Sequence, residues 1–271
     1  MHGLSDLKTI DLNLRIAMRF FGQATGGGSI QSFPSVEAVY SGLDYGVFNI
    51  AFLTERVSAP RDLGLLLACC GRYYHERAVN GCIKKVRWSF WLCEDLLDLS
   101  ARRRSRDVFF DAGLRPISQA PGMIAASLAP PSRPLPEIEC CAVKSAPLRS
   151  AFTGVTSVCF DIPIAIASAV YEPEGAWQGE YRGFVGFAHG QPVSIVALVH
   201  AEGALGIYSL GTLPEYRRRG YGEALLRAAI AQMQDGEAPH RLVLESTEAG
   251  YPLYRRLGFR DAARFTVYLT K

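Results

Sequence analysis

The stretch "LPEYRRRGYGEALLRAAI" (residues 213–230) leads from a short apolar run into a helix. Apolar side chains recur four residues apart at Leu225, Ala229 and Met233, which predicts an amphipathic helix with one broad buried face. Directly before it stand three arginines and two glycines. Glycines permit a tight turn, and the start of a helix carries partial positive charge. The stretch therefore predicts a site for a phosphate or pyrophosphate, the alternative being a surface loop whose glycines merely cap the helix.

The residues before this loop predict a small antiparallel sheet. Two turn signals, "AHGQP" and "HAEGA", separate three β-rich runs at residues 184–188, 193–200 and 204–210. Pro214 marks the end of the third strand, because proline cannot continue a central strand. We expect the helix to pack its apolar face on these strands.

The remaining sequence predicts an α/β protein of two domains. Strands are expected at residues 46–53 and 86–92, and helices at 59–78 and 94–114. Prolines crowd residues 115–138, which predicts a linker or a surface strap, with "GMIAASLA" as a docked strand or a short helix. We thus expect an N-terminal α/β domain at 1–114, a linker at 115–138 and a second domain at 139–271.

Composition excludes several classes of protein. With 49% hydrophobic residues and a net charge of +3, the chain reads as an ordinary globular protein without the basic face of a nucleic-acid partner. The run "ARRRSR" is interpreted as a solvated helix face. No apolar stretch approaches the roughly 20 residues that cross a bilayer, and the seven cysteines show no metal-binding spacing. We expect a cytoplasmic protein with reduced thiols, no metal and no membrane partner.

The motifs resemble a known family. "RRRGYG" matches the (Gln/Arg)-x-x-Gly-x-(Gly/Ala) signature of the GNAT superfamily of N-acetyltransferases. "LVLESTEAGYPLYRRLGFR" resembles the strand and the "N-x-x-A-x-x-L-Y-x-x-x-G-F" ending that follow in that family, and "RFTVYLTK" would supply its last strand. The resemblance covers residues 139–271. It implies a GNAT-like mixed, mostly antiparallel sheet flanked by helices, and acetyl-CoA as acyl donor.

The resemblance also implies roles for particular residues. The backbone near Leu210 would bind the pantetheine arm of coenzyme A, and residues 217–222 its pyrophosphate. Tyr254 occupies the position of a tyrosine that often protonates the departing thiolate. Thr247 and Gly250 replace an asparagine and an alanine of the family pattern. The expected cofactor-binding residues are Leu210, Gly211, Thr212, Arg217, Arg218, Arg219, Gly220, Tyr221, Gly222, Glu223 and Thr247.

The general base is less clearly indicated. Some family members place a catalytic glutamate at a strand position that falls near Gly206 here, and glycine cannot act as a base. Glu245 is our preferred candidate, although pairing with Arg241 or with an arginine of the linker is an alternative role for it. Glu202, His189, His200 or a chain of water molecules are the other candidates.

The expected reaction is direct attack of an amine on acetyl-CoA in a ternary complex, because no cysteine lies beyond Cys159. A small-molecule amine is the preferred acceptor, ahead of an amino-acid derivative or a protein amine. A non-catalytic acyl-CoA-binding module is the competing hypothesis. "FFDAGL" echoes "LYRRLGF", so the N-terminal half is interpreted as a degenerate copy without a second coenzyme A site. We expect a monomer or a homodimer.

Overall fold

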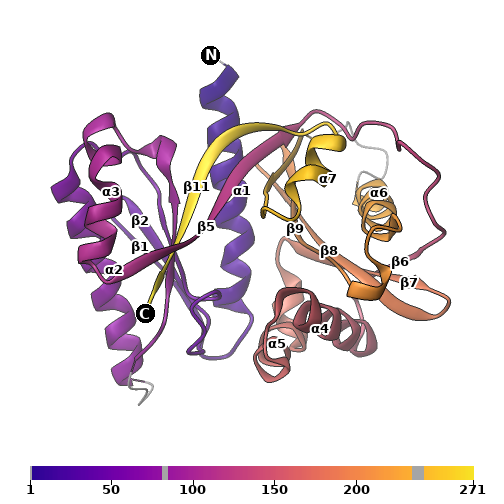
Figure 1. Cartoon of the computed structure of the whole chain (residues 1–271). Helices are drawn as coiled ribbons and strands as arrows, with labels where there is room; N and C mark the ends of the chain where they lie inside the picture. Colours follow the sequence, from indigo (N-terminus) through magenta and orange to yellow (C-terminus); the bar gives the residue numbers. More distant parts are fainter. Residues whose placement is uncertain (1, 81–84, 234–240) are drawn as a thin grey trace.

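The computed structural model describes residues 2–80, 85–233 and 241–271. In this part of the chain the strands form one continuous 11-stranded sheet, in the order β1-β2-β3-β4-β11-β5-β10-β9-β8-β7-β6. Helices cover both faces of the sheet (Figure 1). The expected α/β class, with a mixed and mostly antiparallel sheet, is confirmed.

Each half of the sheet has its own elements. The N-terminal half contains α1 (His2–Gln23), β1 (Ser29–Phe33), β2 (Val36–Tyr40), β3 (Ile50–Leu53), α2 (Pro60–Asn80), β4 (Ser89–Cys93), η1 (Glu94–Leu96), α3 (Leu99–Asp111) and β5 (Leu114–Ala125). The C-terminal half contains β6 (Glu139–Ala142), α4 (Ala146–Phe160), α5 (Ile164–Tyr171), η2 (Glu174–Gln178), β7 (Tyr181–Ala188), β8 (Gln191–Ala201), β9 (Ala204–Thr212), η3 (Pro214–Tyr216), α6 (Tyr221–Met233), β10 (Arg241–Glu245), α7 (Tyr251–Arg256) and β11 (Arg260–Thr270).

The two halves repeat one order of elements. In each, three antiparallel strands lead through a helix to a parallel strand, and a second helix then leads to a last strand. The last strands are exchanged: β5 pairs with β10, and β11 pairs with β4, while β5 and β11 also pair with each other. Figure 1 shows these two long strands running together between the two halves of the molecule. This repeated topology supports the interpretation of the N-terminal half as a degenerate copy.

The expected linker needs a correction. Residues 115–125 belong to β5, a strand with partners on both sides, and only residues 126–138 run outside helices and strands. The prolines of β5 stand where a ladder is irregular. Pro116 is register partner of Tyr268 at a bulge, and Pro121 lies just beyond the last pair with β10. The division into 1–114 and 139–271 stays a prediction about folding units.

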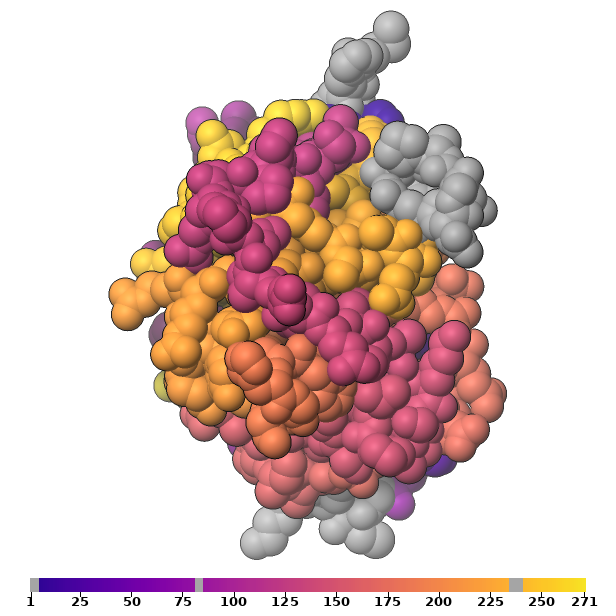
Figure 2. Space-filling view, turned by 90° about the vertical axis from the view of Figure 1, so that its right-hand side faces the viewer, coloured from indigo at the N-terminus to yellow at the C-terminus, as the bar shows by residue number. Residues whose placement is uncertain are grey.

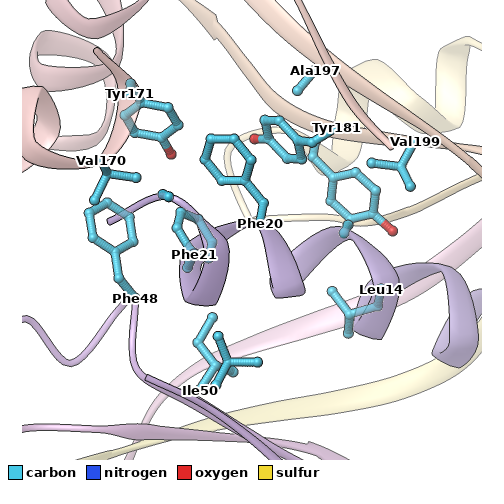
Figure 3. Packing of buried hydrophobic residues seen from close by; sticks show 14 of the residues in the cluster. Leu14, Phe20, Phe21, Phe48, Ile50, Val170, Tyr171, Tyr181, Ala197 and Val199 are labelled. Carbon is cyan, nitrogen blue, oxygen red and sulfur yellow. The ribbon is translucent and has the colours of Figure 1, made fainter. Parts of the chain in front are cut away.

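Helix α1 joins the two halves through one hydrophobic cluster. Phe20 stacks on Tyr181 of the C-terminal half with ring centroids 4.2 Å apart, and Phe21 stacks on Phe48 of the N-terminal half at 4.5 Å. Figure 3 shows these rings meeting around the end of α1, with Tyr171 beside them. The core is therefore shared, and α1 lies over the sheet on the same face as α4 and α5.

The opposite face carries two further clusters. Helices α2 and α3 pack on the N-terminal strands, and α6 and α7 pack on the C-terminal strands. Among the described residues, no helix is both long and apolar enough to span a bilayer.

Candidate active site

Strands β9 and β10 separate partway along their length. They pair at Arg241↔Ala204, Leu242↔Leu205 and Val243↔Gly206, and the described residues form no further pair between them. β9 nevertheless continues to Thr212 and β10 to Glu245. Beyond the last pair, the backbone groups of β9 on this side have no ladder partner on β10, so an extended, amide-bearing ligand could pair with them.

A β-bulge opens β9 further beside this gap. Ala197 pairs with Tyr208 and Ile195 with Gly211, so Ser209 and Leu210 together face one residue of β8. Ser209 takes a positive φ of 49°. The carbonyls of Gly211 and Thr212 already accept hydrogen bonds. Ser194 Oγ donates to Gly211 O at 2.6 Å, and Arg217 Nε donates to Thr212 O at 2.9 Å. Leu210, Gly211 and Thr212 are the residues expected to contact pantetheine. Of these three, only Leu210 lies in the bulge and has no register partner on β8.

The predicted anion loop lies between β9 and α6. Arg218 and Gly220 have positive φ values of 60° and 97°, and α6 begins directly afterwards. No backbone N–H of residues 218–223 donates a hydrogen bond to a described backbone group. These free donors stand at the positive end of the helix dipole, so their arrangement can hold an anion.

The side chains of the loop divide into two groups. Arg217, Arg218 and Arg219 are exposed and, among the described residues, form no ion pair with an acid. Glu223, by contrast, is buried and pairs with Arg227 at 2.8 Å. Of the expected cofactor-binding residues, Glu223 therefore offers only its backbone N–H, and its carboxylate steadies the first turn of α6.

Tyr254 and Thr247 lie at the other side of the gap, on and before α7. Tyr254 packs edge-on against Phe259 with ring centroids 5.6 Å apart, and its hydroxyl makes no hydrogen bond to a described residue. Burial raises its pKa, so the phenol keeps its proton at neutral pH. Thr247 Oγ1 accepts a hydrogen bond from Gly250 N at 3.2 Å, in the turn that precedes α7.

The presence of Gly250, where the family pattern has an alanine, also has a physical reason. A Cβ at this position would lie 3.1 Å from Tyr254 Cε2, so the alanine of the family pattern would press on the tyrosine ring.

The glycine at position 206 follows from the docking of α1. Asn13 Nδ2 donates to the carbonyls of Val199, Ala201 and Ala204, and its Oδ1 accepts from Tyr208 Oη at 2.7 Å. A Cβ at Gly206 would overlap Asn13 Oδ1 and lie 2.6 Å from Tyr208 Cε2. Helix α1 thus fills the space that a glutamate side chain at position 206 would occupy, and it forms one side of this part of the gap.

Substitution of Gly206 by alanine is therefore expected to destabilise the whole protein. The methyl group displaces Asn13 and breaks its buried hydrogen bonds, which costs roughly 2–4 kcal/mol. Urea denaturation followed by circular dichroism measures the change. Gly154→Ala is the matched control, because nothing lies within 4 Å of a Cβ there and the residue is helical. Equal midpoints for Gly206→Ala and the wild type would contradict the assignment.

Glu245 ends β10 on the face that α1 covers. Both of its carboxyl oxygens are buried and have no hydrogen-bond partner in the structure. Burial and then the negative charge of Asp11 raise its pKa well above the usual range. The pKa of Asp11 is itself raised to about 6 by burial, against the opposing effect of Arg15 at 3.1 Å. The alternative pairing of Glu245 with Arg241 or a linker arginine is wrong here, because neither carboxyl oxygen has a partner and Arg241 instead binds Asp6 at 2.7 Å.

The other candidate bases lie elsewhere. Glu202 is in the exposed turn before β9, and His200 is the register partner of Leu205, so both stand where β9 and β10 are still paired. His189 is in the exposed β7–β8 turn, with β8 and β9 between it and β10. Of these four residues, only Glu245 lies on β10 beyond the last pair with β9.

The sequence predicts no cysteine nucleophile in the C-terminal half, yet Cys159 of α4 lies beside β9. A Cβ at Gly211 would be 3.1 Å from Cys159 Sγ. Burial raises the pKa of this thiol, although Arg217 opposes the shift, so the sulfur stays protonated at neutral pH. No local pattern marks Cys159, because its neighbours come from β9. Among the described residues, no group of acids, histidines and cysteines is arranged to hold a metal ion.

Strands β3 and β4 of the N-terminal half correspond to β9 and β10, but their chains stay hydrogen-bonded beyond the paired residues. β3 and β4 pair in parallel from Ile50↔Ser89, and beyond them Val57 bridges Leu97. Val57 N donates to Leu96 O at 2.9 Å, and Asp98 N to Val57 O at 3.0 Å. These hydrogen bonds therefore close the N-terminal half at the position equivalent to the one where β9 and β10 separate.

Comparison with known proteins agrees with this geometry. Residues 157–259 match the model of the Acetyltransferase (GNAT) family. No curated protein matches the chain. A solved GCN5-related N-acetyltransferase from Kribbella flavida is similar, with 19% identity, a TM-score of 0.65 and coverage of 94% of this chain and 95% of that one.

Two further solved structures share the fold. A functionally unknown conserved protein from Staphylococcus epidermidis has 13% identity and a TM-score of 0.63, over 90% of this chain and 94% of its own. A GCN5-related N-acetyltransferase from Sphaerobacter thermophilus has 17% identity and a TM-score of 0.53, over 87% of this chain and 76% of its own. The resemblance drawn from the motifs is confirmed: residues 157–259 of this chain form an acetyltransferase domain of the GNAT family.

Proposed function

We propose that this protein transfers an acetyl group from acetyl-CoA to the amine of a small molecule. The observation that carries the proposal is the gap between β9 and β10, which continues into a loop of free N–H groups within a GNAT-family domain. Pantetheine pairs with β9 near Leu210, and the pyrophosphate binds the N–H groups of residues 218–223. The thioester then lies in the gap between Glu245 and Tyr254.

The proposed reaction is a direct transfer. The amine nitrogen attacks the carbonyl carbon of the thioester, and the bond from that carbon to sulfur breaks. Glu245, in its ionised form, takes the proton that the amine loses, directly or through a water molecule, and Tyr254 donates its proton to the departing thiolate. Glu245 belongs to the face under α1 and Tyr254 to the α6 face, so base and acid reach the gap from opposite sides.

A small acceptor is favoured by the burial of the base. Both oxygens of Glu245 are buried, and Asp11 of α1 lies close enough for its charge to raise the pKa of Glu245. A free amine can enter such a space more readily than a lysine on the surface of a folded protein. The positive charge of an arriving ammonium group would also lower the pKa of Glu245 and favour its ionised form.

The experiment that tests the function measures free thiol released from acetyl-CoA with a panel of small amines. Calorimetric titration of acetyl-CoA runs in parallel. Turnover with at least one amine supports the proposal. A second function, a non-catalytic acyl-CoA-binding module, is favoured by the missing glutamate at Gly206, and it predicts tight binding with no thiol release on any amine.

Tyr254→Phe is expected to lower kcat roughly 100-fold, because the thiolate then leaves without its proton donor. The dissociation constant for acetyl-CoA should stay within a factor of about two, since the ring and its packing remain. Stopped-flow thiol detection and calorimetry measure the two quantities. Tyr251→Phe on the same helix is the control, because its hydroxyl is exposed and donates to Asp261 at 3.0 Å. A Tyr254→Phe enzyme with wild-type kcat would exclude Tyr254 as the acid.

A further inference from the structure

Residues 126–138 form a strap that is fastened to the C-terminal half. Ala129 N donates to Leu257 O at 2.9 Å, and Arg227 of α6 donates to the carbonyl of Ala129. Ile138, near the end of the strap, packs into the cluster of α6. Figure 2 shows the strap as a magenta band that crosses the orange surface of this half. The strap thus has a defined position between β5 and β6.

The strap and β9 lie on opposite sides of the anion loop. A Cβ at Gly222 would lie 2.9 Å from Thr212 Oγ1 of β9. A Cβ at Gly220 would instead lie 3.0 Å from Pro136 Cδ and 3.8 Å from Arg133 Nη2 of the strap. A ligand that runs along β9 and crosses the loop therefore arrives beside the strap.

Arg133 is placed to meet such a ligand. Its Nη2 donates to Arg218 O at 2.9 Å, which fixes the guanidinium against the loop. The side chain is exposed, and no ion pair joins it to an acid within the described residues. A guanidinium has five N–H donors, so most remain free for an anion. With Arg217, Arg218 and Arg219, Arg133 makes a cluster of four positive charges around one loop.

We propose that Arg133 binds the phosphate on the adenosine ribose of coenzyme A. This inference rests on the proposed function, in which pantetheine lies along β9 and the pyrophosphate occupies the loop. The next anionic group of the ligand is the ribose phosphate, and the side of the loop away from β9 carries Arg133. The N–H groups of residues 218–223 match the pyrophosphate, whereas the strap arginine supplies a separate, planar donor for the third phosphate.

The test compares two ligands that differ in this phosphate alone. Acetyl-CoA and acetyl-3′-dephospho-CoA are titrated calorimetrically into the wild type, Arg133→Ala and Arg133→Lys. Arg133→Ala should weaken acetyl-CoA binding about 10-fold and leave the dephosphorylated ligand unchanged, because only the former has the partner of the lost charge. Arg133→Lys should retain part of the difference, since lysine keeps the charge without the planar fork. Arg103→Ala, an exposed arginine of α3, is the control and should bind both ligands as the wild type does.

The outcomes separate the two proposals. If the wild type binds neither ligand, the coenzyme A site itself is wrong, and this inference falls with it. If the wild type binds both ligands and Arg133→Ala weakens both equally, Arg133 acts on the pyrophosphate or only anchors the strap. If Arg133→Ala changes neither affinity, the ribose phosphate is bound elsewhere.

Discussion

Gly220→Asp is expected to abolish measurable acetyl-CoA binding, which means a loss of at least about 100-fold in affinity. Three effects add. The residue has a φ of 97°, which an L side chain adopts at a cost, and its Cβ would press on Pro136 at 3.0 Å. The carboxylate also brings negative charge to N–H groups that would otherwise hold a pyrophosphate. Calorimetric titration measures the affinity.

The matched control for this variant is Gly190→Asp in the β7–β8 turn. That glycine also has a positive φ, 74°, but nothing lies within 4 Å of its Cβ. The control thus carries the backbone strain and the charge without touching the loop, and it should bind acetyl-CoA as the wild type does. A folded Gly220→Asp protein with wild-type affinity would show that the loop is only a helix cap.

Glu245→Gln is expected to lower kcat by roughly 100- to 1,000-fold with little change in acetyl-CoA affinity. The amide has the shape of the carboxyl group but cannot accept the proton of the amine. Because burial raises the pKa of Glu245, the wild-type kcat/KM should rise with pH through that pKa as the base ionises. The variant should lack this rise. Initial rates across a range of pH values, with thiol detection, measure both effects.

Two further variants sharpen this experiment. Glu202→Gln removes an exposed carboxylate from the turn before β9 and should leave the profile unchanged. Asp11→Asn removes a negative charge beside Glu245, which lowers its pKa, so the rise should move to lower pH. A wild-type rate for Glu245→Gln would exclude Glu245 as the base.

The same raised pKa has a consequence for stability. The folded state holds the proton of Glu245 more tightly than the unfolded state does, so the wild type should lose stability as pH rises from the usual glutamate pKa through the folded one. Glu245→Gln should lose less stability over that range.

Local patterns predicted local structure well. The helix at residues 59–78 and the strands at 184–210 appear as α2 and β7 to β9, because their periodicity and turn residues act within a few positions. The anion loop was found for the same reason, since its glycines and arginines are contiguous in the sequence.

The sequence does not predict which residues far apart in the chain come into contact. Asn13 reaches Val199 across 186 positions, and nothing in the sequence near Gly206 indicates that a helix from the other end of the chain fills its side-chain space. The prolines of β5 argue against a central strand and predict a linker with at most a docked strand in "GMIAASLA", yet each proline of β5 stands beside a bulge or a missing partner. The strands at 29–33 and 36–40 were not predicted at all.

The exchange of β5 and β11 also determines when the protein can finish folding during its synthesis. Cys93 of β4 has Phe265 as register partner, so the edge of β4 stays open until β11 has left the ribosome. Residues 139–271 alone would leave β10 without β5 and β11 without both of its neighbours. Neither half can be excised without an exposed strand edge, a surface on which other chains can assemble.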